Sequence, residues 1–332
     1  MTKPFYSTIF IMNLRPVLLM LSFIFLWSCS NDDEPTTINQ EADNFLNEVL
    51  TIMENNSINK NEIDWDDFRN QIFNEAGTAQ TIDETYGAIR LALTLLNDNH
   101  SFFIRPDGSR FNGRNFPRCT FEDFESPSLP ENIGYVAVSS FTGSNDEESL
   151  AFAESIQQKI AEDDNENISG WIVDLRGNAG GNMWPMLAGL GPILGEGVAG
   201  YFITPDDNEF PWSYTNGASI SGQNPIVQLS NPYDLINPNP KVAVLIDNGV
   251  ASSGEAIAVS FIGRSNTKSF GSATCGLSTG NSTFNLSNSS TLFLTTVYFA
   301  DRDKNQFGGQ LLPDVESDNQ TIIEDAIEYI EN

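Results

Sequence analysis

Residues 242–256 read VAVLIDNGVASSGEA, an apolar run that ends in a polar turn and continues into a second apolar segment. An apolar run rich in β-branched residues and bounded by turn residues is typical of a strand buried on both faces. Similar runs begin at Gly134 and Gly170, separated by an amphipathic segment over 147–161, and another covers 291–297. Strands that alternate with helices predict an α/β fold with a mainly parallel sheet covered on both faces.

Helical patterns precede this core. Apolar residues recur at helical spacing over 42–53 and 81–96, and the chain length of 332 residues leaves room for a small extra region. We therefore predict an N-terminal helical region over 41–105, followed by the α/β core over 106–332. Several prolines with Asn and Ser over 216–240 indicate a long surface loop in that core.

The start of the chain has the layout of an export signal. Arg15 precedes an apolar run over 17–27, which is shorter than the roughly 20 residues that span a bilayer. The run ends in LWSC, which resembles a bacterial lipobox with Cys29 as the lipid attachment site. We predict a signal peptide with its lipobox over 1–29 and a flexible tether over 30–40. The mature protein would be a lipoprotein anchored to a bacterial membrane, the outer membrane, and would lie at the cell surface or in the periplasm. The alternative is an ordinary signal peptide that ends in a chance cysteine.

The amino-acid composition limits which partners, metals and cofactors we expect the chain to bind. With 16 Lys and Arg against 45 Asp and Glu, the formal net charge is -29, so we expect no nucleic acid partner, because phosphate binding needs basic side chains. A single His cannot build a His-rich metal site, and no cofactor or metal is predicted. Cys119 and Cys275 show no framework spacing, and we interpret them as two buried free thiols.

The single His is His100, in the segment DNHS over 98–101. Imidazole titrates near neutrality, so it can take a proton from a hydroxyl group and return it. The alternative is a structural His at a helix end, where a cation interacts favourably with the C-terminal dipole.

Ser252 stands at the predicted strand-to-helix turn. There its hydroxyl would be exposed, and the amides of the helix start would point at an oxyanion formed beside it. The alternative is a plain capping box, because Ser252-x-x-Glu255 is the spacing in which hydroxyl and carboxylate satisfy the first amides of a helix.

A glycine-rich turn follows the strand that begins at Gly170. Residues 171–182 read WIVDLRGNAGGN, without the spacing of a phosphate loop or of a dinucleotide site. Glycines let the backbone approach a ligand closely, so the N–H groups of this turn could complete an oxyanion hole. A tight turn without function is the alternative.

Together these segments resemble the C-terminal processing (tail-specific) serine peptidases. The resemblance rests on motifs in the family's order, namely GYV at 134–136, DLRGNAGG at 174–181, ASSGE at 251–255, G-x-x-T-x-G at 271–276 and PDV at 313–315. It implies a crotonase-like (ClpP/crotonase) βα spiral core in which Ser252 is the nucleophile. It also implies an oxyanion hole made by the backbone amides of Ser253 and of Gly180 or Gly181.

The chain departs from the family pattern at the residue that acts as the general base. Leu277 occupies the position of the Lys in the Ser-Lys branch, whereas DNHS matches the segment that supplies a His in the tricorn-like branch. The resemblance thus makes His100 the base and Ser101 a helper. The Glu of that branch has no counterpart, which leaves Asp301 or Asp303 as candidate orienting carboxylates. No room exists for a PDZ domain, so 216–240 becomes the expected specificity element.

The resulting prediction is a serine-type peptidase that cleaves peptide bonds through an acyl-enzyme. Its substrate would be a peptide or protein, and it would touch the membrane through the lipid anchor alone. A non-catalytic surface lipoprotein that binds peptides or apolar ligands on the same fold is the alternative. An acyl-CoA enzyme is disfavoured, because the chain has no basic cluster for the coenzyme phosphates.

Overall fold

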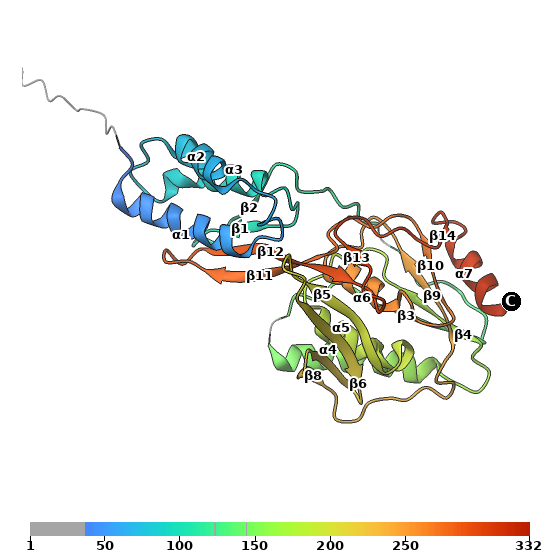
Figure 1. The fold of residues 1–332 in the computed structure, drawn as a ribbon. Helices are drawn as coiled ribbons and strands as arrows, with labels where there is room; N and C mark the ends of the chain where they lie inside the picture. Colours follow the sequence, from blue (N-terminus) through green and yellow to red (C-terminus); the bar gives the residue numbers. More distant parts are fainter. Residues whose placement is uncertain (1–36, 123, 144) are drawn as a thin grey trace, which may run out of the picture. The chain divides into compact units, whose positions relative to one another are not determined.

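The computed structural model describes residues 37–122, 124–143 and 145–332 (Figure 1). The predicted signal peptide, Cys29 and most of the tether lie outside these residues. The described part is a mixed α/β fold in which Thr37–Asn332 form one unit. Its helices are α1 (Gln40–Asn56), α2 (Trp65–Ala76), the short 3-10 helix η1 (Asp83–Thr85), α3 (Tyr86–Leu95), α4 (Asp146–Asp163), α5 (Met183–Leu194), α6 (Ser253–Phe261) and α7 (Ile322–Glu331).

The strands form two sheets. The five-stranded sheet has the order β14-β10-β9-β4-β3, and its members are β3 (Ile133–Ala137), β4 (Gly170–Asp174), β9 (Lys241–Ile246), β10 (Thr267–Gly271) and β14 (Val315–Glu316). The nine-stranded sheet consists of β1 (Phe102–Ile104), β2 (Arg110–Asn112), β5 (Gly197–Ile203), β6 (Glu209–Thr215), β7 (Ala218–Ser221), β8 (Asn224–Gln228), β11 (Thr279–Asn285), β12 (Thr291–Ala300) and β13 (Gln306–Phe307).

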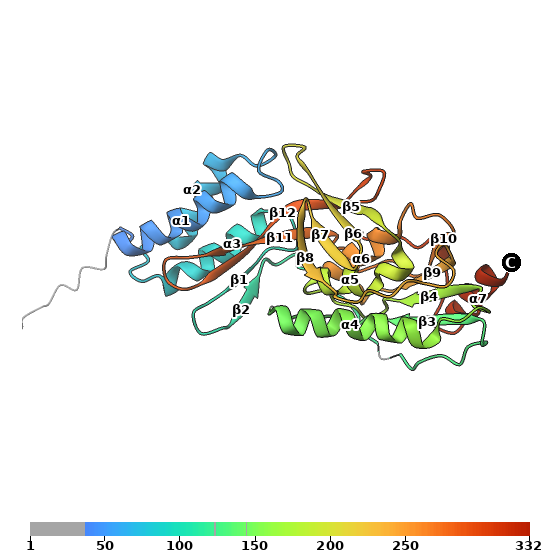
Figure 2. The same cartoon turned by 90° about the horizontal axis from the view of Figure 1, so that it is seen from below.

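The five-stranded sheet is parallel throughout, as the apolar runs predict. Alternate residues of each strand point to opposite faces, and both faces are buried. Val242 and Val244 pack with α4, α5 and α6, whereas Ala243 and Leu245 pack against α7. Figure 2 shows α5 and α6 close to β5 and β6, with which they also pack. The carboxyl ends of β4 and β9 therefore open on one edge of a rigid, covered sheet.

The nine-stranded sheet is antiparallel throughout, which corrects two expectations. The predicted strand over 291–297 is β12, and it pairs in this sheet rather than in the parallel one. The predicted long loop over 216–240 contains β7 and β8, which pair with each other next to β6. Proline is tolerated there because β8 is an edge strand.

The N-terminal helices have an apolar cluster of their own. Phe45, Leu50 and Ile89 are buried in it, together with Leu292 and Leu294 of β12. Phe299, farther along β12, belongs to the cluster around the parallel sheet. The strand β12 therefore joins the helical region that ends before His100 to the core that carries Ser252.

Candidate active site

Ser252 occupies the turn between β9 and α6 in a strained backbone conformation, with φ 52° and ψ -121°. A non-glycine residue with such a positive φ costs on the order of 1–3 kcal/mol and persists where the surroundings impose it. Here the N–H of Ala251 donates to the carbonyl of Asn178 and the N–H of Gly254 to that of Ala251, each at 2.9 Å. The Ser252 side chain is half-buried, so its hydroxyl is presented at the end of the strand.

Gly180 and Gly181 lie against this turn, both with positive φ, at 93° and 112°. A Cβ atom on Gly180 would stand 2.6 Å from the carbonyl oxygen of Ala251 and 2.7 Å from the nitrogen of Ser253. A Cβ atom on Gly181 would stand 2.1 Å from the carbonyl oxygen of Phe141. Only glycine fits at both positions, and the missing Cβ of Gly180 is what lets this turn approach the backbone around Ser252 closely.

The amides of the turn differ in availability. The N–H of Gly180 donates to Asn178 Oδ1 at 2.9 Å, whereas no hydrogen bond within the described residues takes the N–H of Gly181 or of Ser253. Ser253 is the first residue of α6, where helical N–H groups have no partner in the helix. Its hydroxyl donates to the Gly181 carbonyl at 2.6 Å, which brings the two residues together. Gly181 therefore suits an oxyanion hole better than Gly180.

Glu255 is fully buried beside Ser252, with 0% of its surface exposed. Its Oε2 accepts the N–H of Ser252 at 2.9 Å, which is the carboxylate half of the capping box, and the N–H of Leu277 at 2.7 Å. Its Oε1 accepts the hydroxyl of Thr274 and the N–H of Gly276. Burial raises the pKa of Glu255 to about 7, although these donors act in the opposite direction. The carboxyl group thus connects the turn that carries Ser252 to residues 274–277.

His100 is buried where the chain leaves α3 and enters β1. Its backbone N–H donates to Asp98 Oδ1 at 3.0 Å, and its ring Nδ1 lies 2.8 Å from Thr279 Oγ1. Burial lowers the pKa of His100 to about 4, and the charge of Arg110 acts in the same direction. The ring is therefore neutral at pH 7, which is the state that accepts a proton.

A single short segment links the two candidate residues, directly to His100 and through Glu255 to Ser252, and we call residues 274–279 the bridging segment. Leu277 shares Glu255 Oε2 with Ser252, and Thr279 holds the ring of His100. The N–H of Thr279 donates to the Leu277 carbonyl at 2.7 Å, which makes this end of the segment tight. Ser252 and His100 share no direct hydrogen bond in the described part of the chain, and the bridging segment connects them.

The other predicted site residues have structural partners. Asp301 is buried, and its carboxylate accepts the N–H groups of Asp303 and Asn305 and the side-chain amide of Asn305. These bonds belong to a local turn, and the ring of His100 bonds to Thr279 instead. Ser101 donates to Asp98 Oδ2 at 2.6 Å and accepts the N–H of Thr295, so it fixes the end of the helical region to β12.

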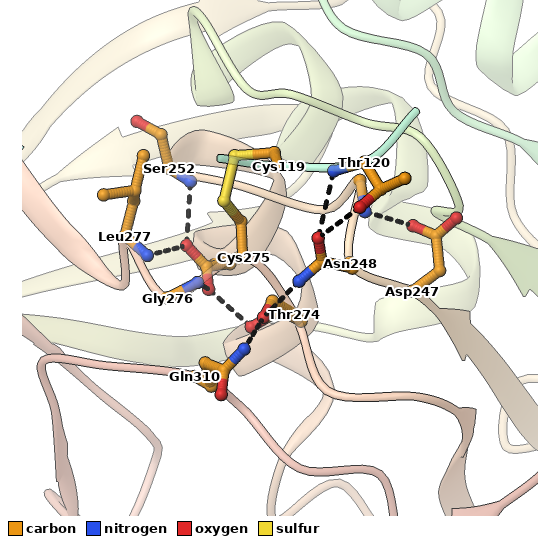
Figure 3. Close-up of a disulfide and its surroundings, with 12 residues drawn as sticks. Cys119, Thr120, Asp247, Asn248, Ser252, Thr274, Cys275, Gly276, Leu277 and Gln310 are labelled. Carbon is orange, nitrogen blue, oxygen red and sulfur yellow. Dashed lines mark hydrogen bonds between the residues drawn. A yellow bond between two sulfur atoms is a disulfide. The ribbon is translucent and has the colours of Figure 1, made fainter. Parts of the chain in front are cut away.

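The prediction of two free thiols is wrong, because Cys119 and Cys275 form a disulfide (Figure 3). The two cysteines are 156 residues apart in the sequence but meet in the fold, because the segment after β2 runs beside the turn that follows β9. Both the N–H and the hydroxyl of Thr120 donate to Asn248 Oδ1 there. Two cysteines in the body of a chain predicted to be exported were the signal for a disulfide. The bond tethers the bridging segment at Cys275.

Thr279 is the functional candidate that sequence reasoning missed, since no motif marks a threonine that contacts an imidazole from a distant part of the chain.

The described residues contain no cluster of three metal-ligating side chains and no helix long and apolar enough to cross a bilayer. A cavity of about 640 Å³ lies at the start of α1, and none of the candidate site residues lines it.

Comparisons with known proteins agree with this architecture. The nisin-resistance protein of Lactococcus lactis subsp. lactis is 27% identical over 317 residues, which is 95% of this chain and 94% of that protein. A lipoprotein from Streptococcus agalactiae has a similar structure, with a TM-score of 0.69 and 22% identity, covering 89% of this chain and 97% of that one. The photosystem II D1 C-terminal processing protease has a TM-score of 0.56 at 15% identity, covering 85% and 94%. At these identities the two structures show a common fold.

The family match is more specific than these likenesses. Residues 132–317 match peptidase family S41, a range that runs from β3 through β14. It includes the glycine turn, the strained serine and the bridging segment. The chain belongs to peptidase family S41.

Proposed function

We propose that this member of the family is an active serine peptidase in which Ser252 forms an acyl-enzyme and His100 is the general base. The observation that carries the proposal is the strained φ of Ser252 at a strand end, beside the N–H groups of Ser253 and Gly181. A strained strand-to-helix turn of this kind exposes a nucleophilic hydroxyl next to oxyanion donors. An N-cap residue ordinarily has dihedral angles in the β region, so the capping box alone does not explain that conformation.

In the proposed reaction, Ser252 Oγ attacks the scissile carbonyl carbon while its proton passes to Nε2 of His100. The resulting oxyanion accepts the N–H groups of Ser253 and Gly181, with Gly180 as the alternative donor. The imidazolium then protonates the leaving amine as the C–N bond breaks. Water, losing a proton to the same ring, releases the carboxylic acid product and regenerates Ser252. The position of Leu277 supports this His-dependent scheme, because no Lys stands there.

The proposed substrate is a peptide or protein bound in an extended conformation along a strand edge, so that main-chain hydrogen bonds supply affinity. The parallel sheet has edge strands at β3 and β14. We also propose the crotonase-like core as the scaffold. Nisin belongs in the first substrate panel, since one relative is named for resistance to it.

We further propose that the chain is exported and held at a membrane by lipid on Cys29. The lipobox-like LWSC and the description of a structural relative as a lipoprotein support this location. Metabolic labelling with a palmitate analogue should mark the wild-type chain and not Cys29→Ala. Labelling that persists in the variant would contradict the anchor.

The activity is tested with a peptide library, nisin included, and with mass spectrometry of the products. Wild type should cleave, and Ser252→Ala should lose at least about 10³-fold in kcat, because nucleophile and base act as one unit. Ser289→Ala is the matched control, since Ser289 also has a positive φ, of 67°, and lies exposed in the turn between β11 and β12. Equal cleavage by wild type and Ser252→Ala would contradict the role of Ser252, whereas no cleavage by wild type would favour the non-catalytic binding protein.

A further inference from the structure

The imidazole of His100 has an unusual partner for a general base. Its Nδ1 lies 2.8 Å from the hydroxyl oxygen of Thr279, and both residues are buried. No carboxylate hydrogen-bonds to the ring within the described residues, because Asp98 accepts only the backbone N–H of His100 and its other bonds go to Ser101. In serine hydrolases a carboxylate usually accepts the Nδ1 proton and so leaves Nε2 able to take the proton of the nucleophile.

We propose that Thr279 is the positioning residue of this site: its hydroxyl oxygen accepts the Nδ1 proton of His100 and fixes Nε2 as the atom that accepts the proton of Ser252. The kinetic part of this inference rests on the proposed acyl transfer. The tautomer of the ring does not, because it is a property of the folded chain without substrate.

The short contact does not by itself set the direction of the bond. A hydroxyl can donate or accept, so the 2.8 Å distance is compatible with either ring tautomer. We assign the hydroxyl as the acceptor, because a neutral ring that carries its proton on Nδ1 leaves Nε2 able to accept a proton. The NMR experiment below measures this assignment directly.

The backbone around His100 and Thr279 is held by hydrogen bonds other than the one that orients the ring. Besides the bond to Asp98, the carbonyl of His100 accepts the side-chain amide of Asn281 at 3.2 Å. Thr279 is itself held through its backbone, since its N–H donates to Leu277 and the residue pairs with Tyr298. Removing the hydroxyl alone should therefore release the ring while the chain on both sides keeps its place.

The sequence makes the test direct, because the only imidazole signal comes from His100. The experiment compares the ¹⁵N NMR spectrum of the ring and the steady-state kinetics in wild type, Thr279→Val and Thr279→Ser. Wild type at pH 7 should show the tautomer with the proton on Nδ1. Thr279→Val, which keeps the shape without the hydroxyl, should shift toward the other tautomer. It should lose about 10- to 100-fold in kcat, the scale found when the partner that orients a metal-bound His is removed, with KM nearly unchanged.

Thr279→Ser restores the hydroxyl and should return both the tautomer and most of kcat. Thr283→Val is the matched control, because Thr283 is exposed on the same strand, and it should behave as wild type. A Thr279→Val protein that keeps the wild-type tautomer overturns the inference, as does wild type with the proton on Nε2. If no variant hydrolyses peptides, the proposed function fails, and the tautomer comparison still decides the role of Thr279.

Discussion

At the residue scale, Gly180 makes a close contact with the turn that carries Ser252. Gly180→Ala should lower kcat/KM by about 10²-fold or more, because its Cβ would force the Ala251 and Ser253 backbone to shift, and displacements of about 1 Å have effects of that size. Gly195→Ala is the control, since Gly195 also has a positive φ, of 84°, but nothing within 4 Å of the added atom. It should lose about 1–2 kcal/mol of stability from backbone strain and keep kcat/KM. Equal kinetic losses in both variants would contradict the account.

His100 also sets a pH dependence. Its pKa is about 4 in the folded protein and near the ordinary value of 6.5 when unfolded, so between these values the unfolded chain binds a proton that the folded chain does not. The free energy of unfolding should therefore fall as pH decreases from 7 to 5, by about 2 kcal/mol from this residue. His100→Gln should lack this loss. Glu255, whose pKa is raised, contributes with the opposite sign in both proteins and cancels in the comparison.

Urea unfolding of both proteins at pH 7 and pH 5 measures the difference. A loss of equal size in wild type and His100→Gln would show that the imidazole is not held in its neutral form. The single His removes any ambiguity about which imidazole titrates.

At the element scale, the disulfide determines how firmly the bridging segment is held. Cys275 stands between Thr274 and Gly276, which both donate to Glu255. A Cys119→Ser, Cys275→Ser double variant should lose about 2–4 kcal/mol of stability, a typical effect of removing a disulfide. It should also lose part of kcat, because the segment supports Ser252 and His100. A reductant should impair wild type and leave the double variant unchanged; an equal effect on both would contradict this role.

The elements also show where sequence reasoning succeeded and where it could not. The parallel strands, α6 and the serine turn follow from local patterns, because a strand buried on both faces needs a continuous apolar run. The helix α2 was missed, since Phe68 and Ile72 form a sparse stripe, although Asp64 caps it. The pairing of β7 and β8, the Cys119–Cys275 bond and the contact of Thr279 with His100 depend on distant parts of the chain, which no local pattern encodes.

At the scale of the whole molecule, two apolar clusters share one strand. Leu292 and Leu294 of β12 pack with the N-terminal helices, whereas Phe299 packs in the cluster of the parallel sheet. The two regions should therefore unfold together, and calorimetry of Thr37–Asn332 should show a single transition. Leu294→Ala should lower its midpoint, at a cost of about 2–5 kcal/mol for a buried leucine. Two separate transitions in the wild-type protein would show that the His100 region is independent of the core.

The central claim is that Ser252 is a nucleophile activated by His100, and a fluorophosphonate probe tests it most directly. Mass spectrometry of the labelled protein should locate one adduct, on Ser252, that is absent in Ser252→Ala and unchanged in Ser289→Ala. Labelling of His100→Ala should be slower by about 10²- to 10⁴-fold, the usual contribution of a general base. An adduct on another residue, or labelling that is as fast without the imidazole as with it, would contradict the account.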